Sequence, residues 1–200
     1  MGYTYYSNNE YNSKLVVPAA TSLVPVAEFR IQLNLGSDDS LDDELNQFLL
    51  AAQDTAGNTI GDSIAPNEYQ VSYSFFEDRL SLPHATIQSL DSVAYYAEGD
   101  TTTTTVDSSV YFLDTTGDTP AVVKNANQNF PSDASRLHEF PVVIDYTAGY
   151  DHVTSMPRAM AQAILVIAAD MYKNRESVSD TRNYPVPFAA QRLLRPFRRY

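Results

Sequence analysis

The sequence predicts an α+β fold, mainly an α-helical bundle with a small inserted antiparallel β-sheet and an extended C-terminal tail. Apolar residues recur with helical spacing twice, at residues 41–61 and again from 156 to about 174. Between these segments, residues 68–75 alternate apolar and polar side chains, which is the period of a half-buried strand. The expected architecture is therefore a helical body interrupted by a sheet.

Two helices are expected before the sheet. The first runs from Val24 to Leu35, because Pro25 suits the start of a helix and apolar residues follow it. The second follows candidate N-caps at residues 38–40, and its apolar residues recur at positions 41, 45, 48, 49 and 52. It should end near the glycines at 57 and 61, and its early carboxylates favour the positive end of the helix dipole.

The sheet is expected to be antiparallel and to carry polar loops. Besides residues 68–75, strands are predicted at Ile87–Tyr96, Val110–Leu113 and Pro141–Tyr146. The polar segments Glu98–Thr105 and Thr115–Asp118 contain the Gly and Asp residues typical of turns, so we expect them at hairpin tips. The five threonines at 101–105 fit a mobile loop better than a glycosylated stalk.

The last long helix is expected to begin near Met156, with Ser155 as a cap and Pro157 in the first turn. Its apolar residues occur on all sides, so it should be buried in a core or an interface. The helix should stop at about residues 174–177. A polar linker and one or two further helical turns at Phe188–Leu194 should follow.

These elements predict three segments along the chain. Residues 1–20 are expected to be a polar N-terminal arm. Residues 21–180 should form the folded domain, with the β insertion at about 68–147. Residues 181–200 should form a basic docking tail. No repeat of 20 to 50 residues occurs.

The composition fits one folded domain, or a domain with a sizeable insertion, because 44% of the 200 residues are hydrophobic. The net charge of −12 argues against broad nucleic-acid affinity, which needs clusters of Lys and Arg. The lack of Cys excludes disulfides and cysteine ligands. No basic region precedes an apolar run at the N-terminus, and the longest apolar stretch is about half of the roughly 20 residues that span a membrane. Neither a signal peptide nor a membrane contact is expected.

Candidate catalytic groups are scattered, so the chain is predicted not to be an enzyme. His152 follows Asp151 beside a turn, and His84 and His138 lie far apart in the sequence. No nucleophile elbow, His-Glu-x-x-His pair, Walker loop or dinucleotide fingerprint is present. The acidic cluster at 38–44 lacks the spacing and central glycine of a calcium loop. We expect no catalytic residue, no metal ligand and no cofactor.

Charge is segregated at the C-terminus. Five arginines, at positions 182, 192, 195, 198 and 199, give the last twenty residues a charge of +5, with no carboxylate side chain among them. Residues 1–180 carry 8 basic and 25 acidic side chains, a net charge of −17. A basic, aromatic terminus on an acidic body predicts docking on another acidic surface.

The order of motifs in residues 141–200 resembles that of the head-to-tail connector, or adaptor, proteins of tailed bacteriophages. A strand leads into Tyr146-Thr147-Ala148-Gly149-Tyr150, then Met156-Pro157 and the apolar helix with Met171-Tyr172-Lys173-Asn174-Arg175-Glu176. Val186-Pro187 and the terminal Leu193-Leu194-Arg195-Pro196-Phe197-Arg198-Arg199-Tyr200 follow. The resemblance is architectural from about residue 20 and specific only at the C-terminus.

This resemblance implies a structural virion protein of the neck, assembled in the host cytoplasm. It implies a homo-oligomeric ring, commonly dodecameric, below the portal protein, which joins the DNA-filled capsid to the tail or stopper protein. Double-stranded DNA would pass through the channel without specific binding, and an acidic lining would repel its phosphates. The residues expected to dock on the portal are Arg192, Leu193, Leu194, Arg195, Phe197, Arg198, Arg199 and Tyr200.

Two other functions remain open from the sequence. One is a different neck or tail-completion protein of the virion, which would bind a tail tube in place of the portal. The other is a non-viral β-containing binding module that uses a Tyr-rich surface. Copurification with a portal ring distinguishes the first from an adaptor, and a monomer with a small-molecule ligand would favour the second.

Overall fold

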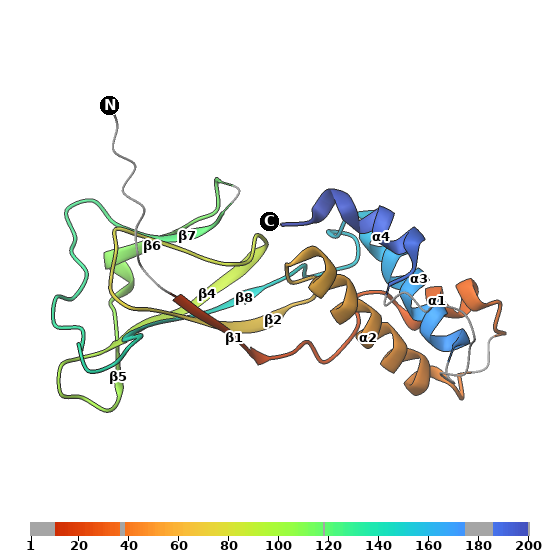
Figure 1. The fold of residues 1–200 in the computed structure, drawn as a ribbon, viewed down its shortest axis with the longest axis horizontal. Helices are drawn as coiled ribbons and strands as arrows, with labels where there is room; N and C mark the ends of the chain where they lie inside the picture. The colour runs from red at the N-terminus through yellow and green to blue at the C-terminus, as the bar shows by residue number, and fades with distance from the viewer. Residues whose placement is uncertain (1–10, 37–38, 118, 175–185, 200) are drawn as a thin grey trace. The chain divides into compact units, whose positions relative to one another are not determined.

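The chain divides into two compact units in its computed structural model (Figure 1). The structure describes residues 11–36, 39–117, 119–174 and 186–199. The first unit contains Asn67–Ala148 together with the described residues up to Pro18, and the second contains Ala19–Pro66 and the described residues from Gly149 onward. Each unit has its own hydrophobic core.

The first unit contains two antiparallel sheets. The five-stranded sheet has the order β1-β2-β8-β4-β5, and the three-stranded sheet has the order β3-β7-β6. Their strands are β1 (Tyr11–Val17), β2 (Asn67–Tyr73), β3 (Arg79–Ser81), β4 (Ile87–Tyr96), β5 (Thr103–Thr105), β6 (Tyr111–Asp114), β7 (Ala121–Lys124) and β8 (Val142–Ala148).

Alternation along the strands places apolar side chains between the two sheets. Val71 of β2, Ile144 of β8 and Val122 of β7 are fully buried and belong to the same core cluster. Because this cluster includes strands of both sheets, the sheets pack face to face around one core.

Neighbouring strands of the larger sheet are also linked by polar side chains. The carboxylate of Asp145 in β8 accepts a hydrogen bond from Gln70 Nε2 in β2 at 2.7 Å and from Ser92 Oγ in β4 at 2.9 Å. Asp145 thus joins the three central strands of the sheet.

The second unit is helical (Figure 1). Its described helices are α1 (Val26–Leu33), α2 (Asp42–Ile60), α3 (Arg158–Lys173) and α4 (Phe188–Leu194), followed by a 3₁₀ turn at Arg195–Phe197. The expected burial of α3 is confirmed, because its residues at 160, 163–165 and 167–169 are all buried. Only residues 158, 162, 170 and 173 of α3 are exposed.

The α+β class is as predicted, but the protein is not mainly a helical bundle with a small sheet. Strands β3 and β7 were not predicted. Strand β1 lies within the segment expected to be a polar arm, and β5 lies within the expected threonine loop. The helical turns expected at Phe188–Leu194 are confirmed as α4. A 3₁₀ turn follows at Arg195–Phe197, so the described residues after 185 do not form the extended tail of the predicted fold class.

Side-chain caps were predicted less well than helix positions. Leu41 is the N-cap residue of α2 and Pro157 that of α3, and neither helix has a side-chain hydrogen bond at its cap. Ser155 instead donates a hydrogen bond from Oγ to Asp151 at 2.7 Å in the preceding turn. Packing, more than capping, therefore determines where α3 begins.

Gly149 allows two backbone segments of the helical unit to approach closely. Its φ is +122°, and a Cβ added there would lie 2.0 Å from the carbonyl oxygen of Ala65. The amide of Tyr150 donates to the carbonyl oxygen of Ile64 at 2.7 Å, so a backbone hydrogen bond holds the two segments together beside this contact. A side chain at this position would separate them.

We predict that Gly149→Ala lowers the free energy of unfolding by more than about 2 kcal/mol, because the new methyl group collides with backbone in a strained conformation. Gly99→Ala is the control, since Gly99 also has positive φ, at +84°, but has no atom within 4 Å of the added Cβ. Denaturant titration of both variants tests this. Equal losses would show that the close approach to Ala65 is unimportant.

We also predict that Ile164→Asp prevents stable folding of the helical unit. Ile164 is 0% exposed, and an unpaired buried carboxylate costs several kcal/mol, comparable to the roughly 5 to 15 kcal/mol stability of a domain. Gln162→Asp places the same carboxylate on an exposed position of the same helix and should change the melting temperature little. A normal melting temperature for Ile164→Asp would contradict the burial of α3.

Candidate partner-binding surface

Helix α4 has one buried and one exposed face. Ala190 and Leu194 are four residues apart, so they lie on the same side of the helix, and both are 0% exposed in the core of the helical unit. Phe188 and Arg192 have the same spacing, but both are exposed, and Phe188 is 71% exposed. The sequence of α4 therefore attaches the helix by one face and presents the other.

The residues after α4 are fixed to the end of α2. Arg199 donates its backbone N–H to the carbonyl oxygen of Ile60 at 2.8 Å, and Arg198 donates from Nε to the carbonyl oxygen of Thr59 at 3.0 Å. The guanidinium of Arg199 also lies 3.6 Å from the carboxylate of Asp62. The last turn of α2 has no basic residue of its own, so these arginines supply the donors and positive charge that a helix C-terminus favours.

A groove of about 500 Å³ lies beside these contacts. Its lining combines three guanidinium groups with an exposed aromatic ring and a few apolar and polar side chains: Thr59, Val186, Phe188, Gln191, Arg192, Arg195 and Arg198. The guanidinium carbon of Arg192 lies 5.8 Å from the centre of the Phe188 ring, a cation–π distance. We call these seven residues the basic groove.

In the described part of the chain, no ion pair neutralises the arginines of the basic groove. The ion pairs between described residues in the helical unit join Arg30 to Asp42 and Arg199 to Asp62, and none includes Arg192, Arg195 or Arg198. Three guanidinium groups close together repel one another and attract carboxylates, which they bind in a bidentate manner. The groove is therefore suited to an acidic segment with an apolar side chain.

The structure places the eight expected docking residues in different environments. Arg192, Arg195 and Arg198 are exposed and line the basic groove. Leu194 is buried, and Leu193 and Phe197 are partly buried against the same core. Arg199 is partly buried at the end of α2, and Tyr200 lies outside the described residues.

Sequence reasoning missed Phe188 and Gln191 as members of the groove. The spacing of four between Phe188 and Arg192 after Pro187 was the available signal. Gln191 donates from Nε2 to the carbonyl oxygen of Val186 at 2.8 Å and so holds the entry of the helix. Thr59 comes from α2, and only the tertiary fold brings it to the groove.

None of the three histidines considered as catalytic candidates lines the basic groove. His84 Nδ1 is 2.7 Å from the hydroxyl of Tyr146, and the ring of His84 lies 3.8 Å from that of Tyr69. His138 stacks on Tyr96 at 4.2 Å, and His152 is exposed. These contacts are packing and hydrogen-bonding interactions of individual rings.

The described residues contain neither a metal-binding cluster nor a membrane-spanning helix. Residues 11–36, 39–117, 119–174 and 186–199 contain no group of three or more His, Cys, Asp or Glu placed to hold a metal ion. Within the same ranges, no helix combines the length and the apolar character needed to cross a membrane.

Comparison with known proteins gives matches among solved structures. No protein-family model and no curated protein sequence matches the chain. A chain from the neck of an empty gene transfer agent (GTA) particle, computed with C6 symmetry, matches with a TM-score of 0.70 and 23% identity, over 94% of this chain and 95% of that one. A chain in the virion of the native GTA particle matches with a TM-score of 0.67, 23% identity and 94% coverage of both chains. A chain from the native GTA neck, computed with C12 symmetry, matches at 0.66 with the same identity and coverage. These matches show that the protein shares their fold over nearly its whole length.

Shortening a side chain to Ala should affect the free energy of unfolding differently on the two faces of α4. We predict that Leu194→Ala lowers the free energy of unfolding by about 2 to 5 kcal/mol, the usual cost of a core Leu→Ala change. Phe188→Ala removes a larger side chain from an exposed position and should cost much less. Denaturant titration distinguishes the two, and a larger loss for Phe188→Ala would reverse the assignment of the faces.

Proposed function

We propose that the protein is a structural, non-catalytic subunit of the neck of a tailed virus-like particle. In this role it acts as a head-to-tail adaptor, forms a ring below the portal, joins the DNA-filled capsid to the tail and lines the DNA exit channel. The observation that carries the proposal is the shared fold with GTA neck chains over 94% of this chain. The resemblance of residues 141–200 to phage adaptors supports the same role independently.

A cyclic homo-oligomer, with twelve copies as the proposed number, fits this role. The similar chains belong to necks computed with C6 and C12 symmetry. A ring of more than two copies needs heterologous contacts, in which each subunit uses two different surfaces. Two compact units in one chain provide such different surfaces.

The basic groove is the proposed docking site for the portal. Arg192, Arg195 and Arg198 offer charge-assisted hydrogen bonds, and Phe188 offers an apolar anchor. Helix α4, which carries most of the groove, is anchored by the buried Ala190 and Leu194, and Arg198 is hydrogen-bonded to Thr59, so little backbone entropy is lost on docking. Its expected occupant is an acidic, partly apolar segment of the portal.

The acidic composition suits a channel for DNA. The whole chain has a net charge of −12, and carboxylates near a channel repel phosphate groups. In the proposed role, double-stranded DNA therefore passes the ring without specific binding.

We predict that Arg195→Glu weakens binding to the portal ring of the same particle by about tenfold or more. The change replaces an attraction to carboxylates by a repulsion, and tenfold corresponds to about 1.4 kcal/mol. Binding is measured by surface plasmon resonance at several salt concentrations, and the loss should shrink as salt increases.

Arg158→Glu is the matched control for this experiment. Arg158 is also exposed in the helical unit, but it belongs to the first turn of α3 and does not line the basic groove. It should bind the portal like the unmodified protein. Equal weakening by both variants would indicate a general charge effect, and unchanged binding by Arg195→Glu would remove the groove from the interface. Binding to a tail tube and not to the portal would favour a different neck or tail-completion protein.

A further inference from the structure

The outer strands of the five-stranded sheet, β1 and β5, are exposed, and β1 is rich in apolar residues. All seven residues of β1 are exposed, and Tyr11, Leu15, Val16 and Val17 are between 45% and 55% exposed. The three threonines of β5, at the other edge, are also exposed. Among the described residues, each of these edge strands pairs on one side only, so its other side presents backbone N–H and C=O groups to which another strand can bind.

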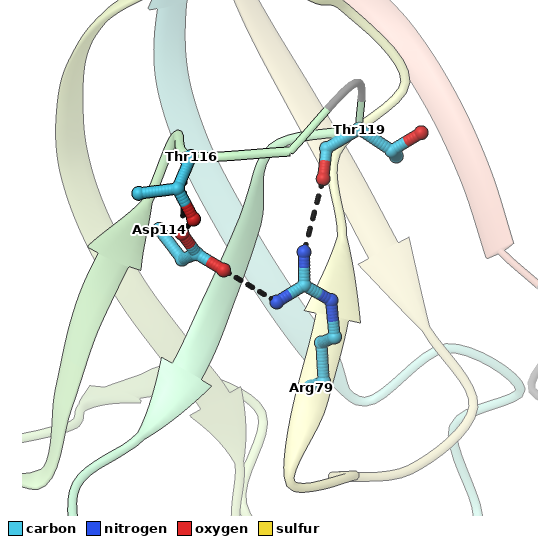
Figure 2. A network of polar contacts seen from close by, with 4 residues as sticks. All are labelled: Arg79, Asp114, Thr116 and Thr119. Atoms are coloured by element: carbon cyan, nitrogen blue, oxygen red, sulfur yellow. Dashed lines mark hydrogen bonds and ion pairs between the residues drawn. The ribbon is translucent and has the colours of Figure 1, made fainter.

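The outer strands of the three-stranded sheet in the same unit differ from these, because both carry a charged residue that takes part in an ion pair. Each outer strand carries a charge, and Figure 2 shows that these charges are joined: Arg79 Nη1 of β3 lies 2.6 Å from the carboxylate of Asp114 of β6. Arg79 Nη2 also donates to the carbonyl oxygen of Thr119 at 3.1 Å, and Asp114 accepts from the hydroxyl of Thr116 at 2.6 Å. Hydrogen bonds from Arg79, and then from Thr116, hold the pKa of Asp114 well below its usual range, so this pair stays charged.

Charged side chains on edge strands oppose the addition of further strands. By this criterion the three-stranded sheet is protected at both edges. In the five-stranded sheet, β5 carries no charged residue, and the protection of β1 is limited to Lys14, one charge in seven residues, and to the register shift between Leu15 and Val17. Charge is denser on β3, with one charged residue in three, and on β6, with one in four. Of the two sheets, the five-stranded one is suited to growth by strand addition.

We infer that β1 of one copy pairs with β5 of the next, so that the five-stranded sheets of neighbouring copies join into a continuous sheet. This inference rests on the proposed function, because it identifies the heterologous contact that a cyclic neck requires. Pairing of β1 with β1 would be isologous, would stop at two copies and would leave β5 open.

The topology supports head-to-tail pairing. Each neighbouring pair in the order β1-β2-β8-β4-β5 is antiparallel, so four reversals bring β5 into the same direction as β1. A neighbouring copy in the same orientation therefore places its β5 parallel to β1. Charge complementarity also favours this pairing, because β1 carries the basic Lys14 and the segments flanking β5 carry the exposed, acidic Asp100 and Asp107.

Cross-linking tests the contact directly, because the chain contains no Cys of its own. Ser13→Cys lies in the middle of β1 and Thr104→Cys in the middle of β5, and both positions are exposed. The two single variants of the full chain are mixed and treated with a short bismaleimide. We expect a covalent dimer in the mixture, little dimer in either variant alone, and a ladder of oligomers from the double variant.

Substitution at the edge gives a second readout. Leu15→Lys, at a position 50% exposed on β1, should weaken self-association by about tenfold or more in sedimentation experiments, because it adds a charge at the junction. Phe112→Lys, at a position 47% exposed on β6, is the control and should not change self-association. Thermal melting of both variants checks that the fold is retained.

Three results would overturn the inference. Dimers formed by Ser13→Cys alone would show pairing of β1 with β1. Oligomers that form without β1–β5 cross-links would show that another surface joins the copies, while leaving the neck proposal intact. A chain that stays monomeric up to its solubility limit would also contradict edge pairing, whereas the neck role is tested separately by portal binding.

Discussion

Burial of one face of α4 in the helical core is the contact on which the candidate surface depends. Ala190 and Leu194 are fully buried, and this places Phe188 and Arg192 on the outside. The chain then returns to the end of α2, where the donors of Arg198 and Arg199 meet backbone carbonyl oxygens. A segment that looks like a free basic tail in the sequence is thus part of the fold, and its charges are held in position before any partner binds.

In the proposed role, the two units would meet two different requirements of assembly. The helical unit presents charge in a groove, where an acidic partner gains from charge-assisted hydrogen bonds. The β unit presents open backbone at two sheet edges, where a further strand gains hydrogen bonds whatever its side chains. Each surface lies within one unit that has its own core, so a variant at one surface leaves the other available for measurement.

The sequence predicted the elements that have a strong period. Helices α2 and α3 and strands β2 and β4 were found because burial on one side, or all around, imposes a repeating pattern on 7 to 19 residues. Strand β1 was missed because all of its residues are exposed, so burial imposes no alternation on it. Strands β3 and β7 have three and four residues, too few for a period to be recognised. Strand β6, also of four residues, was predicted because it contains the aromatic residues Tyr111 and Phe112.

Three of the seven residues of the basic groove were also predicted from the sequence. The arginines were found because charge segregation needs no knowledge of the fold. The burial of Leu194 was not found, because a seven-residue helix between prolines reads equally well as a docking peptide. The contribution of Thr59 depends on a contact between residues more than a hundred positions apart, which a single sequence does not reveal.

Electron microscopy of assembled particles that contain a tagged copy of this chain tests the central proposal most directly. The account predicts a cyclic ring of this chain between the capsid and the tail, with the basic groove against a neighbouring protein. Density for the chain in the capsid shell or at the tail tip would contradict it, and so would a ring whose basic groove faces solvent on every copy.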